Sequence, residues 1–292
     1  MHEFDLFDVP GGRLPRFLVE FSHRPAGFAS IPPIRPDDAT PVTDVMAKPN
    51  ETTFIYDGYV YKRFADPHRC GARVARAKTM DLRVPKVTLI NPWWYSYPYV
   101  KGELLSERTS RLLDFLGWMH TRCWSYRVNA EGWAESFYVE KTARRIAGRD
   151  GADEIIDQIR RRCDGYWTPW LCPYWHGDCS FENVVIVGGE YKLLDWREDA
   201  WGDVAYDLVK LLKSAMFDHR TVKSDGTWQA HKNANALRNL IFDYAKQRLG
   251  ICIPYLRQIE AVHMLAMSGS HEGPLGDNLY KKGVELWQAC SL

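Results

Sequence analysis

Polar and apolar residues alternate along two short runs near the start of the chain, residues 52–56 and 59–64. Alternation with a period of two is typical of a strand that buries one face. The residues between the runs are Asp57-Gly58, a dipeptide that favours a two-residue hairpin turn. Further strands are expected over residues 41–46 and over the aromatic run 93–97. The pattern therefore predicts a small antiparallel sheet.

After residue 101 the apolar positions recur at the spacing of a helix. In residues 106–122 they form an apolar stripe, and further helices are expected over residues 131–146, over residues 153–163 and from about residue 228 onward. Taken together, the two periods predict an α+β fold with two lobes, a small sheet lobe followed by a mainly helical lobe.

The domain organisation follows from where these periods begin. Residues 1–40 are rich in Pro and Gly and have no sustained period, so we expect an irregular extension there. Residues 41–100 would form the sheet lobe and residues 101–292 the helical lobe. A chain of 292 residues with 46% hydrophobic content is long enough for two lobes that share an interface.

Charge and composition exclude several function classes. The formal net charge is +1 and no basic stripe is present, which argues against a nucleic-acid partner. No run approaches eighteen consecutive apolar residues, and the first residues do not resemble a signal peptide, so we expect a cytoplasmic chain without a membrane partner. The seven cysteines include no C-x-x-C pair, which indicates reduced thiols rather than a disulfide framework or a zinc site.

The segment from His176 to Asn183, which reads H-G-D-C-S-F-E-N, carries the candidate chemistry. Phosphoryl transfer requires a carboxylate that orients the acceptor hydroxyl and ligands that hold magnesium on the nucleotide phosphates. Asp178 and Asn183 are five residues apart, as are the corresponding residues of the kinase motif H-R-D-x-x-x-x-N. Asp195 follows a predicted strand, as the magnesium-binding Asp of D-F-G does. We therefore assign Asp178 and His176 as catalytic and Asn183 and Asp195 as metal ligands.

A predicted hairpin brings the two metal ligands together. Residues 184–187 and 191–194 are β-branched or apolar runs joined by Gly188-Gly189-Glu190. Asn183 precedes the first run and Asp195 follows the second, so both lie at the open end of the hairpin. The alternative interpretation is an ordinary hairpin beside an Asp that caps a helix.

Lys62 is the candidate phosphate ligand in the sheet lobe. Alternation places its side chain on one face with Val60 and Phe64, where an unpaired ammonium would be costly. A nucleotide phosphate would be a suitable partner, and the alternative is a lysine that extends to solvent at a sheet edge. The expected helix over residues 68–81 contains no Glu to pair with Lys62, so Asp81 or a residue from elsewhere would have to do so.

These motifs resemble those of a known group of enzymes. H-G-D-x-x-x-x-N at residues 176–183, the D-W pair at Asp195-Trp196, and G-D-x-x-x-D-L at residues 202–208 are similar to the aminoglycoside phosphotransferase and choline kinase-like superfamily. The resemblance implies a bilobal protein-kinase-like fold with ATP and Mg²⁺ as cofactors. It also implies that Asp207 braces the catalytic loop, whereas for Asp203 we favour a simple helix start.

The resemblance extends to a hinge between the lobes. Residues 98–102 follow the aromatic strand and look like this hinge, so adenine is expected to bond to backbone groups around Tyr97, Tyr99 and Val100. Tyr59-Val60-Tyr61-Lys62 resembles V-A-I-K in position, which would direct Lys62 at the α and β phosphates.

The predicted function is transfer of the γ-phosphate of ATP to a hydroxyl of a small molecule, a sugar or polyol by weak analogy. A protein kinase is disfavoured because the short segment between Asp195 and Asp207 leaves no room for a long activation loop. Two alternatives stay open: a pseudokinase or nucleotide-binding module, and another nucleotide-dependent transfer such as adenylylation.

The acceptor is the least determined part of the prediction. Several aromatic residues are expected near the catalytic loop and could stack on a sugar or surround a quaternary ammonium, although aromatics at helical spacing more often form core: Trp133, Phe137, Tyr138, Trp167, Trp170, Tyr174 and Trp175. From residue 217 onward the chain carries seven acidic residues against nine Lys and Arg. That balance favours a neutral or anionic acceptor over a polycation.

Overall fold

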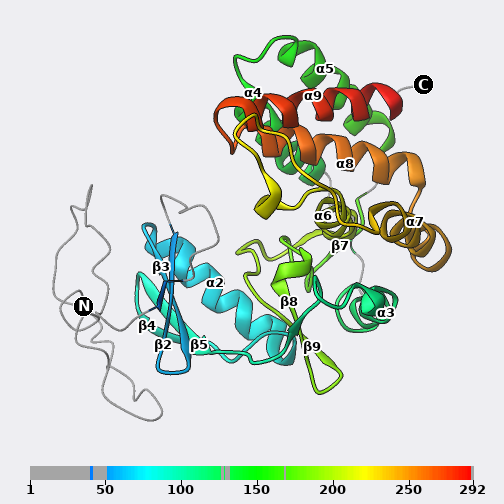
Figure 1. Cartoon of the computed structure of the whole chain (residues 1–292). Coiled ribbons are helices and arrows are strands. Elements are labelled where there is room, and N and C mark those ends of the chain that lie inside the picture. Colours follow the sequence, from blue (N-terminus) through cyan, green and yellow to red (C-terminus); the bar gives the residue numbers. More distant parts are fainter. Residues whose placement is uncertain (1–39, 42–50, 126–127, 129–131, 168, 291–292) are drawn as a thin grey trace. The chain divides into compact units, whose positions relative to one another are not determined.

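The structure is a computed structural model of the chain, and it describes residues 40–41, 51–125, 128, 132–167 and 169–290 (Figure 1). The predicted extension over residues 1–40 and most of the predicted strand over residues 41–46 lie outside the described residues. The chain divides into two compact units. The first contains Met1–Gly102 together with Trp196–Glu198, and the second contains Glu103–Asp195 together with Asp199–Leu292.

The first unit is built on an antiparallel sheet in the order β1-β2-β3-β5-β4. Its strands are β1 (Thr40–Pro41), β2 (Glu51–Tyr56), β3 (Tyr59–Phe64), β4 (Thr88–Asn91) and β5 (Trp94–Pro98). The predicted hairpin of β2 and β3 is confirmed, with Tyr56 opposite Tyr59. Asp57 and Gly58 both have positive φ, 45° and 73°, which is the backbone that a type I′ turn requires.

One helix, α2 (Pro67–Met80), packs against this sheet (Figure 1). Asp66 caps it, because its side chain accepts a hydrogen bond from the backbone N–H of His68 at 2.9 Å, and Pro67 fits the first turn. Its buried residues include Cys70, Val74 and Ala77, which are three and four positions apart and so share a face. The predicted helix over residues 68–81 is confirmed within one residue at each end.

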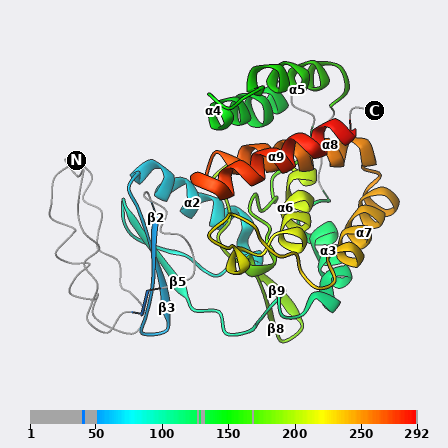
Figure 2. The same cartoon turned by 45° about the horizontal axis from the view of Figure 1, so that its top comes forward.

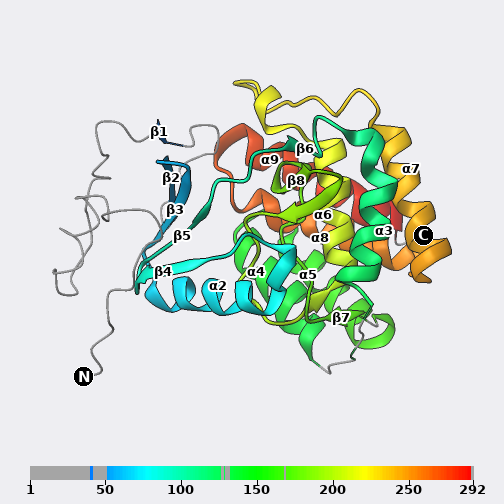
Figure 3. The same cartoon turned by 90° about the horizontal axis from the view of Figure 1, so that it is seen from below.

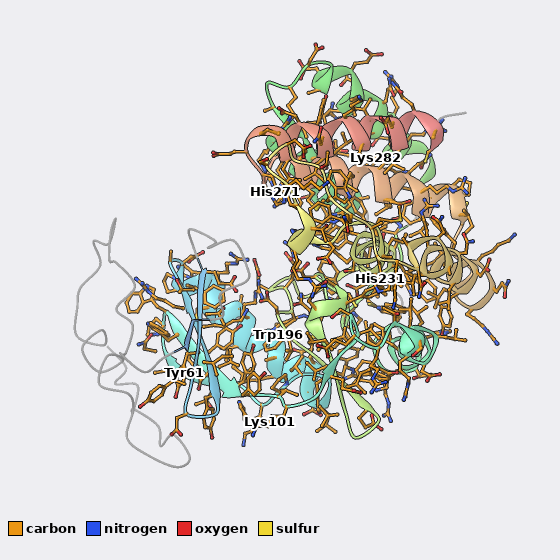
Figure 4. The ribbon with its side chains drawn as sticks, viewed as in Figure 1. Tyr61, Lys101, Trp196, His231, His271 and Lys282 are labelled. Carbon is orange, nitrogen blue, oxygen red and sulfur yellow. The ribbon has the colours of Figure 1, made fainter. Side chains whose placement is uncertain are left out.

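Trp196 belongs to the core of this first unit although it is distant in sequence (Figure 4). Its ring stacks on that of Tyr95, which in turn stacks on Phe64, with centroid distances of 6.2 and 5.6 Å. Its indole N–H donates to the carbonyl of Arg73 in α2 at 3.0 Å. The chain directly after Asp195 is thus fixed by aromatic packing to the sheet unit.

The second unit is mainly helical (Figures 2 and 3). Its α-helices are α3 (Leu112–Arg122), α4 (Lys141–Ile146), α5 (Ala152–Tyr166), α6 (Val204–Met216), α7 (Ala234–Tyr244), α8 (Ile253–Ser268) and α9 (Gly273–Cys290). Two small sheets join them, β6-β8-β9 and β10-β7, formed by β6 (Glu103–Leu104), β7 (Leu171–Cys172), β8 (Val184–Val187), β9 (Glu190–Leu193) and β10 (Gly202–Asp203). The helix α8 lies at the centre, since it packs against α4, α6 and α9.

Two predicted helices differ from the observed ones. The helix expected over residues 106–122 starts only at Leu112. Before it lie a turn, in which the Glu107 N–H donates to the carbonyl of Leu104, and a 3₁₀ helix, Thr109–Arg111. The helix expected over residues 131–146 contains a π-helical segment, Glu135–Glu140, before α4. No helix of the described residues is both long and apolar enough to cross a membrane.

Candidate active site

The loop from His176 to Asn183 is held by one face of α6. Asp207, Lys210 and Ser214 are spaced three and four residues apart on that helix, so they lie on one side of it. In chain order they contact the backbone of His176 and Gly177, the carboxylate of Asp178, and the backbone N–H of Phe181. The helix therefore fixes both ends of the loop on which the candidate base lies.

Asp207 holds the start of the loop through two backbone N–H groups. Its two carboxylate oxygens accept hydrogen bonds from the backbone N–H groups of His176 and Gly177 at 2.8 and 2.7 Å. The indole N–H of Trp124 donates to it as well, at 3.1 Å. Asp207 is fully buried, and hydrogen bonds of this kind are what a buried carboxylate requires. The bracing role that the resemblance implied for Asp207 matches this geometry.

His176 links the base to the segment that ends in Asp195. Its Nε2 lies 2.7 Å from the carbonyl oxygen of Leu194, and its Nδ1 lies 3.1 Å from the backbone nitrogen of Asp178. A carbonyl only accepts and a backbone N–H only donates, so Nε2 carries the proton and Nδ1 accepts. The ring is fully buried, and both of its nitrogens make contacts that hold the loop. The catalytic role expected for His176 stays a prediction.

Asp178 is half-buried, with 30% of its side chain exposed. Lys210 Nζ lies 2.6 Å from its Oδ1. A carboxylate held by an ammonium on one side and partly open on the other suits an acceptor-orienting base, since a hydroxyl proton can approach it. Lys210 was not among the predicted site residues.

Asn183 and Asp195 lie at the same end of the β8–β9 hairpin, as predicted. Val184 is opposite Leu193, and the backbone N–H of Leu194 donates to the carbonyl of Asn183 at 2.8 Å. The side-chain Nδ2 of Asn183 donates to the carbonyl of Asp178 at 2.8 Å. This hydrogen bond fixes the amide so that its oxygen is the atom left for a cation.

Asp195 has a φ of 57°, a conformation that is uncommon outside glycine. Such backbone strain is kept where surrounding structure enforces it, often at functional sites. Here the enforcing contacts are the Leu194 hydrogen bond before it and the buried Trp196 after it. An amide oxygen and a carboxylate are both hard oxygen donors of the type that Mg²⁺ prefers, so the residues present fit this ion.

In the first unit, Lys62 has a protein partner that the sequence did not reveal. Its Nζ lies 3.0 Å from Oε1 of Glu51, on the neighbouring strand, and both side chains are about 95% buried. Asp81, one candidate partner, instead ends α2. Lys62 is opposite Thr53 in the observed register, and Glu51 is the next residue on the same face of β2. The alternation of the two strands could therefore have identified Glu51 as a partner.

Two arginines of α2 also form ion pairs with an acidic residue. Arg69 and Arg73 donate to the two carboxylate oxygens of Glu198 at 3.0 and 2.7 Å, and these pairs lower the pKa of Glu198 although burial opposes them. Glu198 comes from the segment that Trp196 fixes in the first unit. The two arginines therefore have a structural partner.

The expected adenine-binding residues lie at the end of β5. Tyr97 is buried and packs against Tyr95 and Trp196, whereas Tyr99 is exposed. The backbone N–H of Tyr99 donates to the carbonyl of Gly58 at 2.8 Å, so it is occupied by the sheet. The role of Tyr97, Tyr99 and Val100 in binding adenine stays a prediction.

Two further residues of the motif region, Asp203 and Cys179, are buried, and for Asp203 the expected helix start is confirmed. Asp203 caps α6 by accepting from the N–H of Ala205, and it also accepts from the N–H of Trp170 and the hydroxyls of Tyr138 and Tyr255. Burial raises its pKa to about 6. Cys179 is fully buried, and burial raises the pKa of its thiol well above the usual value, which argues against a reactive thiolate.

The aromatic residues near the loop form a packed cluster that includes Tyr206, a member that sequence reasoning missed. The rings of Trp133, Phe137, Tyr138, Trp175 and Tyr206 contact one another with centroid distances of 4.5–6.4 Å. The ammonium of Lys141 lies 4.3 Å from the ring centre of Phe137 and 4.9 Å from that of Tyr206. A cation of the protein itself thus occupies these ring faces.

Comparisons with known structures agree with the protein-kinase-like fold. The choline kinase LicA from Streptococcus pneumoniae aligns over 86% of this chain and 93% of its own, with a TM-score of 0.61 and 13% identity. A choline kinase from Cryptosporidium parvum aligns over 86% and 89%, with a TM-score of 0.58 and 10% identity. Aminoglycoside 2'-phosphotransferase-IIIa in its GDP complex aligns over 88% and 93%, with a TM-score of 0.55 and 12% identity.

The sequence itself identifies the family. Residues 62–249 match the model of the phosphotransferase enzyme family, which is well over half of the chain. No curated protein matches the chain in a sequence search. The chain belongs to the phosphotransferase enzyme family and is a small-molecule kinase with a bilobal, α+β, protein-kinase-like fold.

Proposed function

We propose that this chain transfers the γ-phosphate of ATP to a hydroxyl of a small alcohol, with Asp178 as the base. The observation that carries this proposal is the arrangement around the loop in the second unit. Asp178 is partly open, Asn183 donates to its backbone carbonyl, and Leu194, next to Asp195, bonds to both Asn183 and His176. Base and metal donors are thereby held in one hydrogen-bonded frame.

In the proposed reaction Asp178 orients the acceptor hydroxyl and accepts its proton as the oxygen bonds to the γ-phosphorus. The bond from that phosphorus to the β,γ-bridging oxygen breaks, and ADP leaves. Mg²⁺, when bound by Asn183 and Asp195, would neutralise charge on the nucleotide phosphates. His176 and Asp207 hold the loop, so that the carboxylate of Asp178 does not have to be ordered when the acceptor binds.

We assign Lys62 to the nucleotide phosphates, with Glu51 as the residue that orients it. A buried lysine paired with one carboxylate oxygen at 3.0 Å keeps further N–H donors on its ammonium. In kinases of this general type a lysine on the third strand performs this task together with a glutamate from a helix. Here Glu51 of β2 would replace that helix residue, which resolves the absence of Glu from α2.

The names of the structural neighbours include choline and aminoglycoside substrates, both of them cationic. For this chain we propose a sugar or polyol type of acceptor instead, supported by the acidic and basic balance of residues 217–292 and by Lys141 on the aromatic cluster.

The test is a screen of alcohols with MgATP, in which product masses are read by mass spectrometry. We expect a product heavier by one phosphoryl group, together with ADP, for at least one neutral or anionic sugar or polyol. The Asp178→Asn variant should form it about 10² to 10⁴ times more slowly. Products that carry an adenylyl group would refute phosphoryl transfer. Robust phosphorylation of kanamycin with all sugars and polyols inert would refute the acceptor class.

A further inference from the structure

A second group of basic side chains lies one helical turn beyond the lysine that contacts Asp178. Lys213 is on α6, three residues after Lys210 and on the same side of the helix. Its Nζ lies 2.6 Å from Nε2 of His219 and 5.1 Å from the ring centre of Phe217. The ring of His271, in the turn between α8 and α9, is 6.1 Å from that of His219 (Figure 4). We call Lys213, His219 and His271 the basic cluster.

The ammonium of Lys213 lacks a counter-charge among the residues that the structure describes. Only 9% of Lys213 is exposed, yet no carboxylate of those residues lies within 4.0 Å of its Nζ. A buried ammonium without a carboxylate is costly, and proteins keep such groups mainly where they have a function. Burial, and after it the charge of Lys210, lowers the pKa of Lys213 to about 8, which still leaves it mostly protonated at neutral pH.

The other charged residues near the basic cluster do not neutralise the positive charge of Lys213. Of the acids that interact with Lys213, Asp178 is held by Lys210 and Asp218 by Arg220 at 3.0 Å, while Glu182 is exposed. Arg145 adds a further positive charge near His271. The neighbourhood of Asp178 is therefore positive on this side.

The cluster also has hydrogen-bond donors to offer. The pKa of His219 is lowered to about 3 by burial of its ring nitrogens and by Lys213, so its imidazole is neutral and Nε2 accepts from Lys213. Nδ1 of His219 then carries a proton. His219 as a whole residue is exposed to solvent, although its imidazole packs against Lys213, Phe217 and His271. Nδ1 of His271 is buried and has no hydrogen-bond partner among the described residues.

We propose that Lys213, His219 and His271 bind an anionic group, a phosphate or a carboxylate, of the acceptor whose hydroxyl lies at Asp178. This rests on the proposed function. Successive turns of a helix are about 5 Å apart, so the anion and the reacting hydroxyl would be separated by a few bonds. A small hydroxylated phosphate or hydroxy acid has this size.

The aromatic cluster also favours an anionic acceptor. Lys141 covers Phe137 and Tyr206 and donates to the hydroxyl of Tyr206 at 3.2 Å. A cationic acceptor at Asp178 would have to approach Lys141, Lys210 and Lys213 together, whereas an anionic acceptor would be attracted by all three.

The first test measures binding without catalysis, with inorganic phosphate titrated into the full chain by calorimetry. We expect Lys213→Met to weaken phosphate binding at least tenfold and His219→Ala to weaken it to a smaller extent. Lys246→Met, an exposed lysine on another segment, is the matched control and should bind as the parent does. His219→Ala keeps the test decisive should Lys213→Met fold poorly, because His219 is exposed. Absence of phosphate binding, or equal binding in all variants, would overturn the proposal.

The second test measures activity with acceptors of one carbon skeleton: glycerol, glycerate and glycerol 3-phosphate, and likewise ribitol, ribonate and ribose 5-phosphate. We expect kcat/KM for a charged member to exceed that for its neutral partner at least tenfold, and Lys213→Met to remove this preference. Comparing the carboxylate with the phosphate within each set shows which of the two anionic groups the site prefers. Phosphate binding that depends on Lys213 without any phosphorylated product would support the anion site and count against the proposed function. Preference for the neutral members, unchanged in Lys213→Met, would refute the anion site alone.

Discussion

At the scale of single residues, Asp178 differs from His176, Gly177 and Cys179 beside it because it remains partly open to solvent. His176 and Asp207 are fully buried, and their polar atoms form hydrogen bonds that hold the loop in place. Asp178→Asn should therefore lower kcat by about 10² to 10⁴, the usual contribution of a general base, with little change in MgATP affinity. Single-turnover assays and calorimetry would measure the two quantities. Retention of more than about a tenth of the parent kcat would contradict the assignment.

Gly202 is a second residue whose identity depends on its surroundings, because they leave no space for a side chain. A Cβ at this position would lie 1.9 Å from Cδ2 of the Trp175 ring, which is buried and donates to the carbonyl of Asp199 at 3.0 Å. Gly202→Ala should thus lower the free energy of unfolding by about 1–3 kcal/mol through overpacking. Gly117→Ala, in α3 with open space around the added methyl, should instead be neutral or stabilising by up to about 1 kcal/mol. Thermal unfolding of the two variants would separate these effects, and equal melting temperatures would show that the Trp175 ring moves aside.

At the scale of elements, the β2–β3 hairpin carries a buried ion pair that can be tested as a unit. Removing one partner of a buried pair strands the other charge, at a cost of about 3–5 kcal/mol, while replacing both with neutral residues is often tolerated. Lys62→Met should therefore destabilise the chain more than Lys62→Met combined with Glu51→Gln. Arg69, 4.0 Å from Oε2 of Glu51, keeps part of the counter-charge in the single variant. Both variants should raise the KM for ATP, since both lack the ammonium.

Denaturant unfolding and steady-state kinetics on the single and double variants give both quantities. Recovered stability together with recovered ATP use in the double variant would mean that Lys62 has only a structural role. A parent-like KM for ATP and a parent-like kcat in folded Lys62→Met would lead to the same conclusion.

Asp203 connects elements rather than acting alone, because it caps α6 and accepts hydrogen bonds from the hydroxyls of Tyr138 in the π-helical segment and Tyr255 in α8. Its pKa is raised by burial from 3.8 to about 6, so the folded chain binds this proton more tightly than the unfolded chain does. The corresponding stabilisation is present below about pH 4 and is lost as the pH rises through about 6. The parent minus Asp203→Asn difference in unfolding free energy should fall by on the order of 3 kcal/mol over this window. A difference that does not change with pH would contradict the shift.

The elements also show which parts of the site were predictable. Both hairpins were predicted correctly from Asp57-Gly58 and from the glycines before β9, because the residues that form a tight turn are adjacent in the sequence. Asp178, Asn183 and Asp195 were found because their spacing is fixed by one loop and one hairpin. Glu51 was missed because the strand was taken to begin at residue 52, one residue too late. Lys210, Lys141 and Tyr206 were missed because helix packing, not sequence spacing, brings them near the loop.

At the scale of the whole molecule, the sequence indicated two lobes, but it did not indicate that Trp196–Glu198 is counted with the first unit. The reason is that this assignment depends on long-range partners, the ring of Tyr95 and the guanidinium groups of Arg69 and Arg73. Asp195 thus lies where the chain passes from one unit to the other, with its φ of 57° at the junction. A ligand that binds the folded second unit at Asn183 and Asp195 is expected to stabilise that unit.

The last prediction concerns the two assigned metal ligands, Asn183 and Asp195. A ligand that binds only the folded state stabilises it by about 2.7 kcal/mol at a concentration of 100 times its Kd. MgATP should raise the melting temperature accordingly, and addition of EDTA should remove most of the increase. Asp195→Ala should lose the magnesium-dependent part of the increase, because only Asn183 would remain of the two assigned ligands. In Asp243→Asn, which alters an exposed acid of α7, the full increase should remain. An equal increase with ATP in the presence and absence of magnesium, in the parent and in Asp195→Ala alike, would show that Asp195 is a structural residue and not a metal ligand.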